Sequence, residues 1–360
     1  MERGILVREY GYEYEVQLDK ELWEETKDQV TYDTFLGAMC LRSGRDALKI
    51  VAREYEPTTV LLPALSCDSM IAPFTLYGHC VKYYRLNKDY SINLDDLFEK
   101  IRDVNKPVLF LYMDYFGKQA ISDKILYQLK ENCPNVVFIE DRTHTLLSEK
   151  IRSFEPEYTV ASLRKWIDIP DGGLLWSKVD FKNRTLSDNL DFSITRLNAQ
   201  CMRYEFLESG DLELKKKFRN IFSTVADLID NEQRPGRMSA YSLGRAKQYD
   251  LTVIADKRRA NAEALIKELK EAGYELIQSE AGASDVYVSI LIENRNKIQN
   301  ALAAKGIFCT IIWPLNEEQK DCCQIAKRTE EHMLSIYCDQ RYTVDDMKYI
   351  ALQIVRSSNE

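Results

Sequence analysis

The sequence predicts an α/β protein with a large, mostly parallel β-sheet and a smaller C-terminal α+β domain. Between about residues 30 and 180, short apolar runs alternate with amphipathic helical patterns, which is typical of successive β-α-β units. The chain has 360 residues, 45% of them hydrophobic, enough for one large domain and a smaller one. A Pro-Gly pair at 235 and 236 marks a junction. We therefore expect domains at 1–236 and 237–360.

Four apolar runs are the strand candidates of the large domain. Two helical patterns alternate with them, one at 45–55 before the first run and one at 123–133 between the second and third. Because ligands of such sheets bind beyond the carboxyl ends of the strands, Asp141 and the segment 162–165 are expected to share one crevice. The strand candidates are 58–64, 106–115, 135–141 and 158–163.

The C-terminal part begins, after a polar helical stretch at 181–235, with a long helical pattern. Apolar residues recur from Leu251 to Leu269 at helical spacing, and Gly273 ends the pattern. Val286, Val288 and alternate residues after them predict a strand. The runs 296–306 and 307–315 add a helix and another strand, which completes the predicted α+β domain.

Composition excludes several classes of function. The formal net charge is −8, whereas binding to nucleic acid or an anionic membrane requires clustered Lys and Arg. The nine cysteines show no zinc-like spacing and the chain has three histidines, so no metal site is predicted. The N-terminus has no apolar targeting segment and no apolar run is long enough to span a membrane. These features predict a cytoplasmic protein with reduced thiols.

The first motif that could carry chemistry is "SGR" at Ser43, Gly44 and Arg45. Amide groups at the start of a helix, with a neighbouring arginine, can bind phosphate. A plain serine N-cap followed by glycine explains the same residues. The G-x-G-x-x-G dinucleotide fingerprint is absent.

A second motif, "IEDRTHTL", places Asp141 at a strand end and His144 three residues later. The carboxylate could pair with a cationic ring nitrogen of a cofactor, and the imidazole could bond a phenolic oxygen. A helix-capping aspartate and a buried histidine are the structural alternative.

A third motif, "SLRKWIDIPDGG", contains Ser162 and Lys165. A lysine acts as nucleophile and base when its amine is neutral, which burial favours; most lysines are instead surface charges. If the extended conformation continues, the side chains of Arg164 and Lys165 lie on opposite faces of the strand.

Taken together and in this order, the motifs resemble fold type I pyridoxal-phosphate enzymes, and among them the DegT-type nucleotide-sugar aminotransferases. The resemblance covers residues 43–347 and is strongest at Asp141 and Lys165. It implies a large, mostly parallel sheet with helices on both faces, the cofactor pyridoxal 5'-phosphate and a homodimer with its active site at the subunit interface. The matching segments are "SGRDAL", "LLPALSCDSM", "YFG", "IEDRTHTL", "SLRKWIDIPDGG", "GRMSAYSLGRAKQYD" and "IYCDQRYTVDDM".

The resemblance also implies roles for individual residues. Lys165 attaches the cofactor and moves a proton to and from the substrate, while Asp141 keeps the pyridine nitrogen protonated. His144 faces the phenolic oxygen. The phosphate is held by Ser43, Gly44, Arg45 and Ser162.

The sequence departs from the family at two places. Cys67 stands where the family has an aromatic residue that stacks on the ring; it either contacts the ring face or is a small buried thiol. Pro235 replaces an asparagine that reaches the partner's phosphate, although Arg237 remains. Arg341 and Tyr342 could bind the donor's carboxylate; a salt-bridged surface arginine is the alternative.

These implications predict an aminotransferase that moves an amino group from an amino acid, with glutamate the expected donor, to a keto sugar linked to a nucleotide. Surface polysaccharide or secondary-metabolite sugar biosynthesis is the expected setting. Two alternatives remain open: a relative that keeps the fold without turnover, and a pyridoxal-phosphate enzyme of another reaction type, since decarboxylases and aldolases share the lysine and the aspartate.

Overall fold

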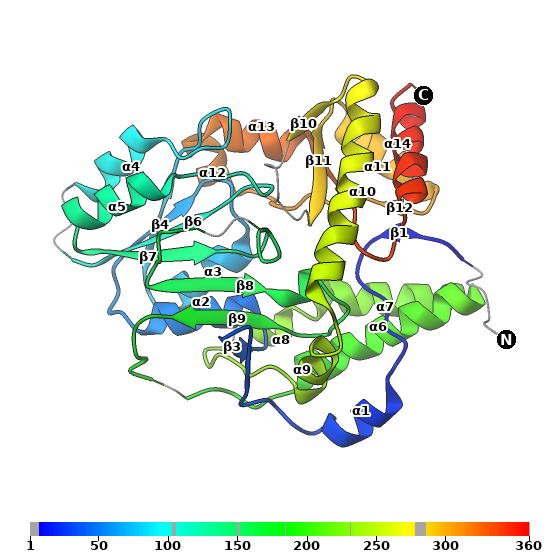
Figure 1. Ribbon diagram of the computed structural model, residues 1–360, viewed down its shortest axis with the longest axis horizontal. Coiled ribbons are helices and arrows are strands. Elements are labelled where there is room, and N and C mark those ends of the chain that lie inside the picture. The colour runs from blue at the N-terminus through cyan, green and yellow to red at the C-terminus, as the bar shows by residue number, and fades with distance from the viewer. Residues whose placement is uncertain are drawn as a thin grey trace. The chain divides into compact units, whose positions relative to one another are not determined.

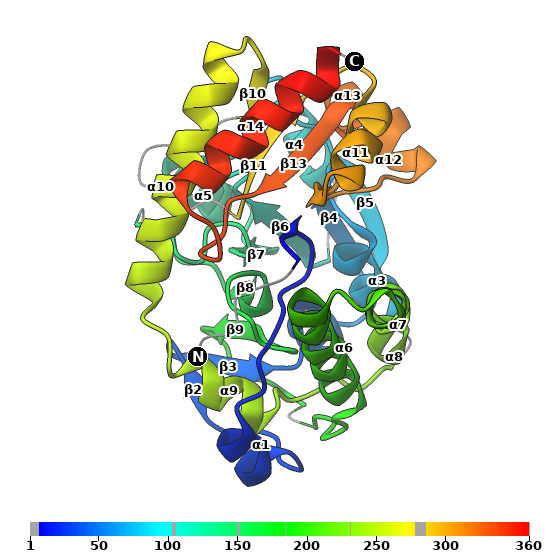
Figure 2. The ribbon, with the colours of Figure 1, turned by 90° about the vertical axis from the view of Figure 1, so that its right-hand side faces the viewer.

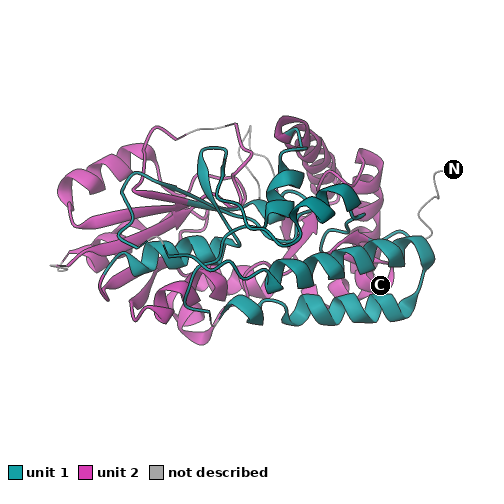
Figure 3. Ribbon diagram, turned by 90° about the horizontal axis from the view of Figure 1, so that it is seen from below, with its two compact units in different colours: residues 1–9, 13–55, 160–250 teal, residues 10–12, 56–159, 251–360 magenta. Residues whose placement is uncertain are grey.

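The computed structural model describes residues 7–102, 106–149, 152–183, 185–230, 232–277 and 286–359. The chain divides into two compact units, coloured separately in Figure 3. Unit 1 comprises residues 1–9, 13–55 and 160–250, and unit 2 comprises residues 10–12, 56–159 and 251–360. The predicted domain boundary after residue 236 lies inside unit 1, and the division at that point stays a prediction.

Unit 1 contains three short antiparallel strands: β2 (Thr34–Phe35), β3 (Ala38–Leu41) and β9 (Gly173–Ser177). β3 pairs with both of the others, with Met39 opposite Leu175. Helix α2 (Gly44–Arg53) packs against β3 and β9. Its strong segregation of apolar residues onto one face explains this packing, and Ser43 caps its N-terminus.

The helical stretch predicted at 181–235 is confirmed from Asp191 onward. Helices α6 and α7 lie side by side (Figure 1), and Gly210 ends α6 with a left-handed backbone, φ 74°. The helices of unit 1 besides α2 are α1 (Lys20–Thr26), α6 (Asp191–Ser209), α7 (Leu212–Thr224), α8 (Asp227–Asp230) and α9 (Ala240–Ala246).

Unit 2 contains four parallel strands in the order β5-β4-β6-β7. They are β4 (Thr59–Pro63), β5 (Cys80–Tyr84), β6 (Val108–Met113) and β7 (Val136–Asp141). All six residues of β6 are buried, as expected for a strand covered on both faces. The connecting helices are α3 (Asp68–Leu76), α4 (Leu94–Ile101) and α5 (Asp123–Asn132).

The strands predicted at 58–64, 106–115, 135–141 and 158–163 are confirmed as β4, β6, β7 and β8 (Tyr158–Ser162). Within unit 2 the paired strands β5, β4, β6 and β7 are all parallel, and helices connect them. The predicted α/β class is therefore confirmed.

A second, three-stranded antiparallel sheet of unit 2 has the order β10-β11-β13. Helices α10 and α14 pack against each other beside it (Figure 2). The elements are β10 (Glu275–Ile277), β11 (Tyr287–Leu291), β13 (Met333–Tyr337), α10 (Leu251–Glu271), α11 (Arg295–Ala304), α12 (Glu317–Cys322), α13 (Gln324–His332) and α14 (Val344–Asn359).

The apolar run 307–315 forms less strand than its composition predicts. Only β12 (Ile307–Phe308) is regular, paired with β1 (Tyr10–Gly11), and Thr310 adds a single bridge to Ser335. Pro314 follows in this run, and proline cannot donate to a β-ladder. Within the described ranges, no helix is long and apolar enough to cross a membrane.

Candidate active-site residues

Lys165 lies immediately after the end of β8, in unit 1. Ser162 is the last residue of the strand, and a single 3₁₀ turn, η1 (Leu163–Lys165), follows. The extended conformation does not continue through Arg164, because the chain turns at Leu163, so the condition for Arg164 to point away from Lys165 is not met. Lys165 is half-buried, and the next residue, Trp166, is fully buried with its carbonyl accepting a 3.1 Å hydrogen bond from the Tyr14 hydroxyl.

The Pro-Asp-Gly-Gly segment after Lys165 is a close turn that contacts two other segments. The Gly172 carbonyl accepts a 3.0 Å hydrogen bond from the Leu163 amide, and the Gly172 amide donates to the Arg42 carbonyl at 2.9 Å. At Gly173 a Cβ atom would lie 2.1 Å from the Ser43 carbonyl oxygen. Only glycine allows the backbones to approach this closely.

The predicted phosphate-binding residues Ser43, Gly44 and Ser162 lie together in unit 1. The Ser43 hydroxyl accepts from the Asp46 amide at 3.2 Å and donates to the Asp46 carboxylate at 2.5 Å. A Cβ atom at Gly44 would lie 3.7 Å from the Ser162 Cβ, so the start of α2 borders the end of β8. Amide groups and the helix dipole at such a start favour an anion.

Two predicted arginines of unit 1 bind acidic neighbours. Arg45 Nε lies 3.0 Å from an Asp230 carboxylate oxygen. Arg237 Nε lies 3.3 Å from Asp188, and its guanidinium stacks 4.2 Å above the Tyr32 ring. Their predicted contacts with phosphate and substrate stay predictions.

Asp141 lies at the carboxyl end of β7 in unit 2, opposite Met113 of β6. Its side chain is buried, and Oδ1 accepts a 2.8 Å hydrogen bond from the Thr143 amide. Because the turn that begins here supplies this donor, the aspartate's position is defined by its own strand end. Asp141 and Ser162 thus each lie at a strand end, as predicted; that they share one crevice stays a prediction.

His144 belongs to an aromatic group that the sequence did not reveal. Its buried ring stacks on Trp313, with centroids 5.3 Å apart and planes 28° from parallel, and Tyr287 meets it at 6.0 Å. Trp313 also contacts Tyr115 and Phe116 edge-on, each at 5.4 Å. The "YFG" segment could have indicated Tyr115 and Phe116, but Trp313 lies too far along the chain for a local pattern to reveal it.

Cys67 lies at the N-cap of α3, directly after β4. Its Sγ is 2.9 Å from the Ser69 hydroxyl. The nearby Tyr115 hydroxyl donates to the Leu65 carbonyl at 2.7 Å. Burial raises the pKa of Tyr115, and the charges of Cys67 and Asp141 contribute in the same direction.

Arg341 and Tyr342 of unit 2 are engaged within the chain. Arg341 Nε and Nη2 lie 2.9 and 2.8 Å from the two carboxylate oxygens of Asp339. Burial acts to raise the pKa of Asp339, but the charge and hydrogen bonds of Arg341 outweigh it and hold this pKa below its usual value. The Tyr342 hydroxyl accepts from the Gly11 amide at 2.6 Å. Their role in binding a substrate stays a prediction.

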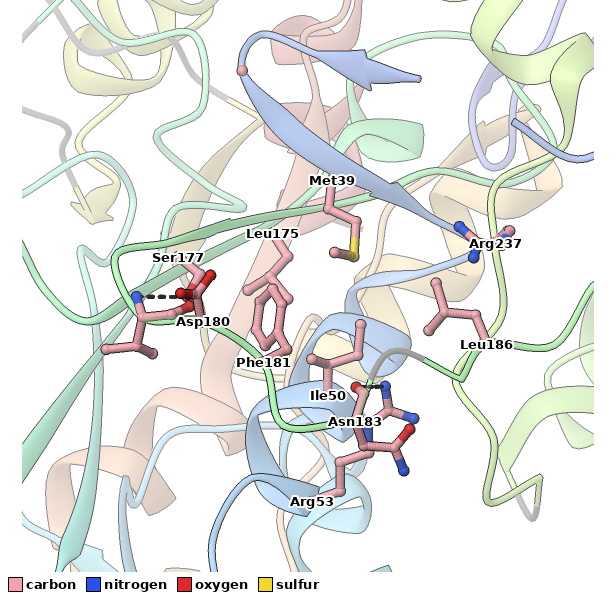
Figure 4. A pocket seen from close by; sticks show the side chains of 12 residues that line it. Met39, Ile50, Arg53, Leu175, Ser177, Asp180, Phe181, Asn183, Leu186 and Arg237 are labelled. Atoms are coloured by element: carbon pink, nitrogen blue, oxygen red, sulfur yellow. Dashed lines mark hydrogen bonds between the residues drawn. The ribbon is translucent and has the colours of Figure 1, made fainter. Parts of the chain in front are cut away.

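Unit 1 also has a cavity of about 390 Å³, shown in Figure 4. Its wall is mixed, with apolar side chains such as Met39 and Leu175 beside polar ones such as Asp180. Arg53, also in the wall, donates to the carbonyls of Asn183 and Thr185 at 2.6 and 2.7 Å. Lys165 and Ser162 do not line it. Among the described residues, no group of three or more histidine, cysteine or acidic side chains could hold a metal.

The residues present fit pyridoxal phosphate in two separate respects. In unit 1 the start of α2 and the Ser162 hydroxyl offer donors to a phosphate beside Lys165. In unit 2 the buried Asp141 carboxylate, whose Oδ1 accepts from the Thr143 amide, is the kind of acceptor that a protonated ring nitrogen requires.

Neither the family models nor the curated proteins compared with this chain match it. The fold is similar to that of solved aminotransferases. PseC of Helicobacter pylori, involved in the biosynthesis of pseudoaminic acid, is 16% identical at a TM-score of 0.67, covering 98% of this chain and 100% of that one. A DegT DnrJ EryC1 StrS aminotransferase of Brucella abortus is 16% identical at a TM-score of 0.62, and the match covers 95% of this chain and 89% of that chain.

A third structure with this fold is NtdA of Bacillus subtilis, solved with bound cofactor PMP. It is 16% identical at a TM-score of 0.60, and the match covers 96% of this chain and 78% of that chain. Together these likenesses confirm the fold implied by the resemblance to DegT-type aminotransferases.

Proposed function

We propose that this protein is a pyridoxal-phosphate-dependent aminotransferase that moves an amino group from an amino acid to a keto sugar. The observation that carries the proposal is the placement of Lys165 directly after β8, with Ser162 and the start of α2 beside each other in the same unit. A lysine next to an anion-binding helix start is what attachment of a phosphorylated aldehyde requires. Solved structures with this fold that are described as a putative sugar aminotransferase and as an enzyme with its TDP-sugar product support the choice of acceptor.

Each residue has a defined task in this proposal. Bound pyridoxal phosphate supplies an electron sink for the electrons of the broken Cα–H bond. Ser43, Gly44 and Ser162 hold the phosphate through hydroxyl and amide donors. Asp141, with Oδ1 fixed by the Thr143 amide, would accept a hydrogen bond from the protonated pyridine nitrogen. Lys165 Nζ would attach the cofactor. Once the donor's amine has displaced it, the free Nζ would take the α-proton of the donor, and in the reverse half-reaction it would return a proton to the acceptor carbon.

The finer parts of the proposal concern substrates and assembly. The donor is glutamate and the acceptor is a nucleotide-linked keto sugar, supported by a solved structure of this fold described with its TDP-sugar product. We also propose a cytoplasmic homodimer in which the partner contributes to the active site, and a role in surface polysaccharide or secondary-metabolite sugar biosynthesis.

A second candidate is a relative that binds the cofactor without turnover. It is favoured by Cys67 at the position of the stacking aromatic residue and by the ion pair between Arg341 and Asp339. A pyridoxal-phosphate enzyme of another reaction type is the third, because the same lysine and aspartate serve it.

A spectroscopic test separates these candidates. The purified protein mixed with pyridoxal phosphate is expected to absorb visible light and to lose this absorbance when glutamate is added. Transfer of the amino group is then followed by mass spectrometry with a panel of keto sugars. Lys165→Ala is expected to abolish covalent attachment and to lower transamination at least about a hundredfold.

The matched control is Lys216→Ala, which removes an exposed lysine of α7 in the same unit and is expected to leave both readouts unchanged. A wild-type protein that stays colourless with added cofactor would falsify the proposal. Colour that no amino acid bleaches supports the second candidate, and bleaching with release of carbon dioxide or an aldehyde supports the third.

A further inference from the structure

Asp171, in the Pro-Asp-Gly-Gly turn after Lys165, is a fully buried carboxylate held by neutral donors. Oδ2 accepts from the Ser193 hydroxyl at 2.7 Å and from the Ser239 amide at 2.8 Å. Oδ1 accepts from the Ser239 hydroxyl at 2.7 Å and from the Ser242 hydroxyl. Among the residues that the structure describes, no lysine or arginine forms an ion pair with it.

Such an arrangement is costly as a stabilising device. Moving a carboxylate out of water without a cation carries a desolvation penalty that hydrogen bonds only partly offset. Burial accordingly raises the pKa of Asp171, against the four hydrogen bonds that lower it. A protein with an apolar residue packed in the same space would often be as stable. The role of the carboxylate in the fold is therefore to connect segments of the chain.

Asp171 connects the turn to two helices. Ser193 lies in the first turn of α6, and Ser239 is the N-cap of α9, with Ser242 one turn later. The next residue, Gly172, accepts from the Leu163 amide at the start of η1 and donates to Arg42. Gly173 then lies against Ser43 at the start of α2. One anchored turn therefore touches both the lysine segment and the anion-binding segment.

The lysine segment needs such an anchor. η1 has three residues, with the Trp166 amide bonded to the Leu163 carbonyl at 2.8 Å, and an isolated 3₁₀ turn has little stability of its own. We infer that Asp171 is a positioning residue, which fixes the Pro-Asp-Gly-Gly turn so that Lys165 is held at a set place relative to Ser43, Gly44 and Ser162. This inference rests on the proposed function for its chemical purpose but makes a structural claim of its own.

The first test needs no cofactor. Amide hydrogen exchange is measured in the cofactor-free protein at Leu163 and Gly172, for the wild type, Asp171→Ala and Asp171→Asn. Asp171→Ala is expected to speed exchange at both amides by about tenfold or more, because local opening becomes easier. Asp171→Asn keeps an acceptor for the Ser239 amide and is expected to retain most of the wild-type protection from exchange. If the alanine variant does not fold, the asparagine variant still allows the comparison with the wild type.

The matched control is Asp96→Ala in unit 2. Asp96 is buried and accepts hydrogen bonds from Arg85 and Lys100, so its loss lowers stability without touching the turn. It is expected to leave exchange at Leu163 and Gly172 unchanged. Equal exchange in Asp171→Ala and Asp96→Ala would overturn the inference.

The second test reports on the lysine itself. Protein loaded with pyridoxal phosphate is reduced with borohydride, and the fraction of bound cofactor attached at Lys165 is determined by peptide mass spectrometry. Asp171→Ala is expected to bind cofactor but to attach at least about threefold less of it. Absence of attachment in the wild type contradicts the proposed function, whereas the exchange experiment still decides the role of Asp171.

Discussion

The strand ends that carry Lys165 and Asp141 are held by different kinds of interaction. In unit 1 the turn after Lys165 is fixed by serine hydroxyls and an amide around one buried carboxylate, Asp171. In unit 2 the strand that ends at Asp141 is held by a cation: Arg152 lies 3.0 Å from Asp123, 3.2 Å from Glu140 and in contact with Asp114. Directional hydrogen bonds from neutral donors suit a turn that must hold the amine of Lys165 in place. The ion cluster around Arg152 instead joins several elements of unit 2, and its stability depends on pH.

Arg152 gives the largest expected effect. Arg152→Met leaves Asp114, Asp123 and Glu140 without their shared cation, and loss of one partner from a buried ion pair costs about 3–5 kcal/mol of unfolding free energy. Denaturant titration measures this loss. Lys130→Met is the control, because Lys130 pairs with Glu157 while 46% exposed, and such a pair contributes less than about 1 kcal/mol. Equal losses in the two variants would show that the Arg152 cluster does not hold unit 2.

The pH dependence of stability is the second expected effect. Burial raises the pKa of Glu140 from 4.5 to about 7, with Asp114 and Asp123 adding to the rise and Arg142 and Arg152 opposing it. The folded protein therefore binds a proton that the unfolded chain releases between these two pH values, so this group lowers stability as pH rises.

Glu140→Gln removes this titration. Relative to the wild type, the variant is expected to gain stability between pH 5 and pH 8, by up to about 3 kcal/mol. Urea unfolding of both proteins at the two pH values measures the gain. Because Asp171 titrates in the same direction, since burial raises its pKa too, the difference between variant and wild type isolates Glu140. If the difference in unfolding free energy between variant and wild type is the same at pH 5 and pH 8, Glu140 stays ionised in the folded protein.

The two regions also differ in how far the sequence could predict them. Strand β7 and the position of Asp141 follow from a continuous apolar run that ends in an acid, because burial on both faces imposes such a run. The anchoring of Asp171 could not be predicted, since its partners lie 22, 68 and 71 positions away in sequence. The "PDGG" sequence predicts a turn, and the aspartate within it looks like an ordinary turn residue.

Two of the strands that the sequence did not predict share one property. β3 and β9 are short and include small residues or stand next to glycines, so neither the period nor the length of an apolar run identifies them. Their pairing brings Gly173 against Ser43, and this contact places the predicted phosphate-binding segment. The same limit explains η1: a chain reversal at Leu163 depends on the distant Gly172 carbonyl, not on the local sequence.

The smallest expected effect compares one serine hydroxyl in each region. Ser193 donates to the buried Asp171 at 2.7 Å, and the exposed Ser153 donates to Asp123 at 2.8 Å. Ser193→Ala removes one of four hydrogen bonds in a dry site, where a net loss of about 1 kcal/mol is expected. Ser153→Ala is expected to cost less than about 0.5 kcal/mol, because water replaces the lost donor.

Thermal and denaturant unfolding of the two serine variants measure this difference, and amide exchange at Gly172 adds a local readout. Exchange there is expected to rise in Ser193→Ala and to stay constant in Ser153→Ala, since Ser193 bonds Asp171, the residue next to Gly172, whereas Ser153 bonds Asp123. If both variants lose the same stability, the two hydroxyls are equally solvated and the turn after Lys165 is no drier than the surface of unit 2. The four hydrogen bonds around Asp171 would then be too weak to fix the position of Lys165. The proposed difference between the two strand ends would no longer hold for the end in unit 1.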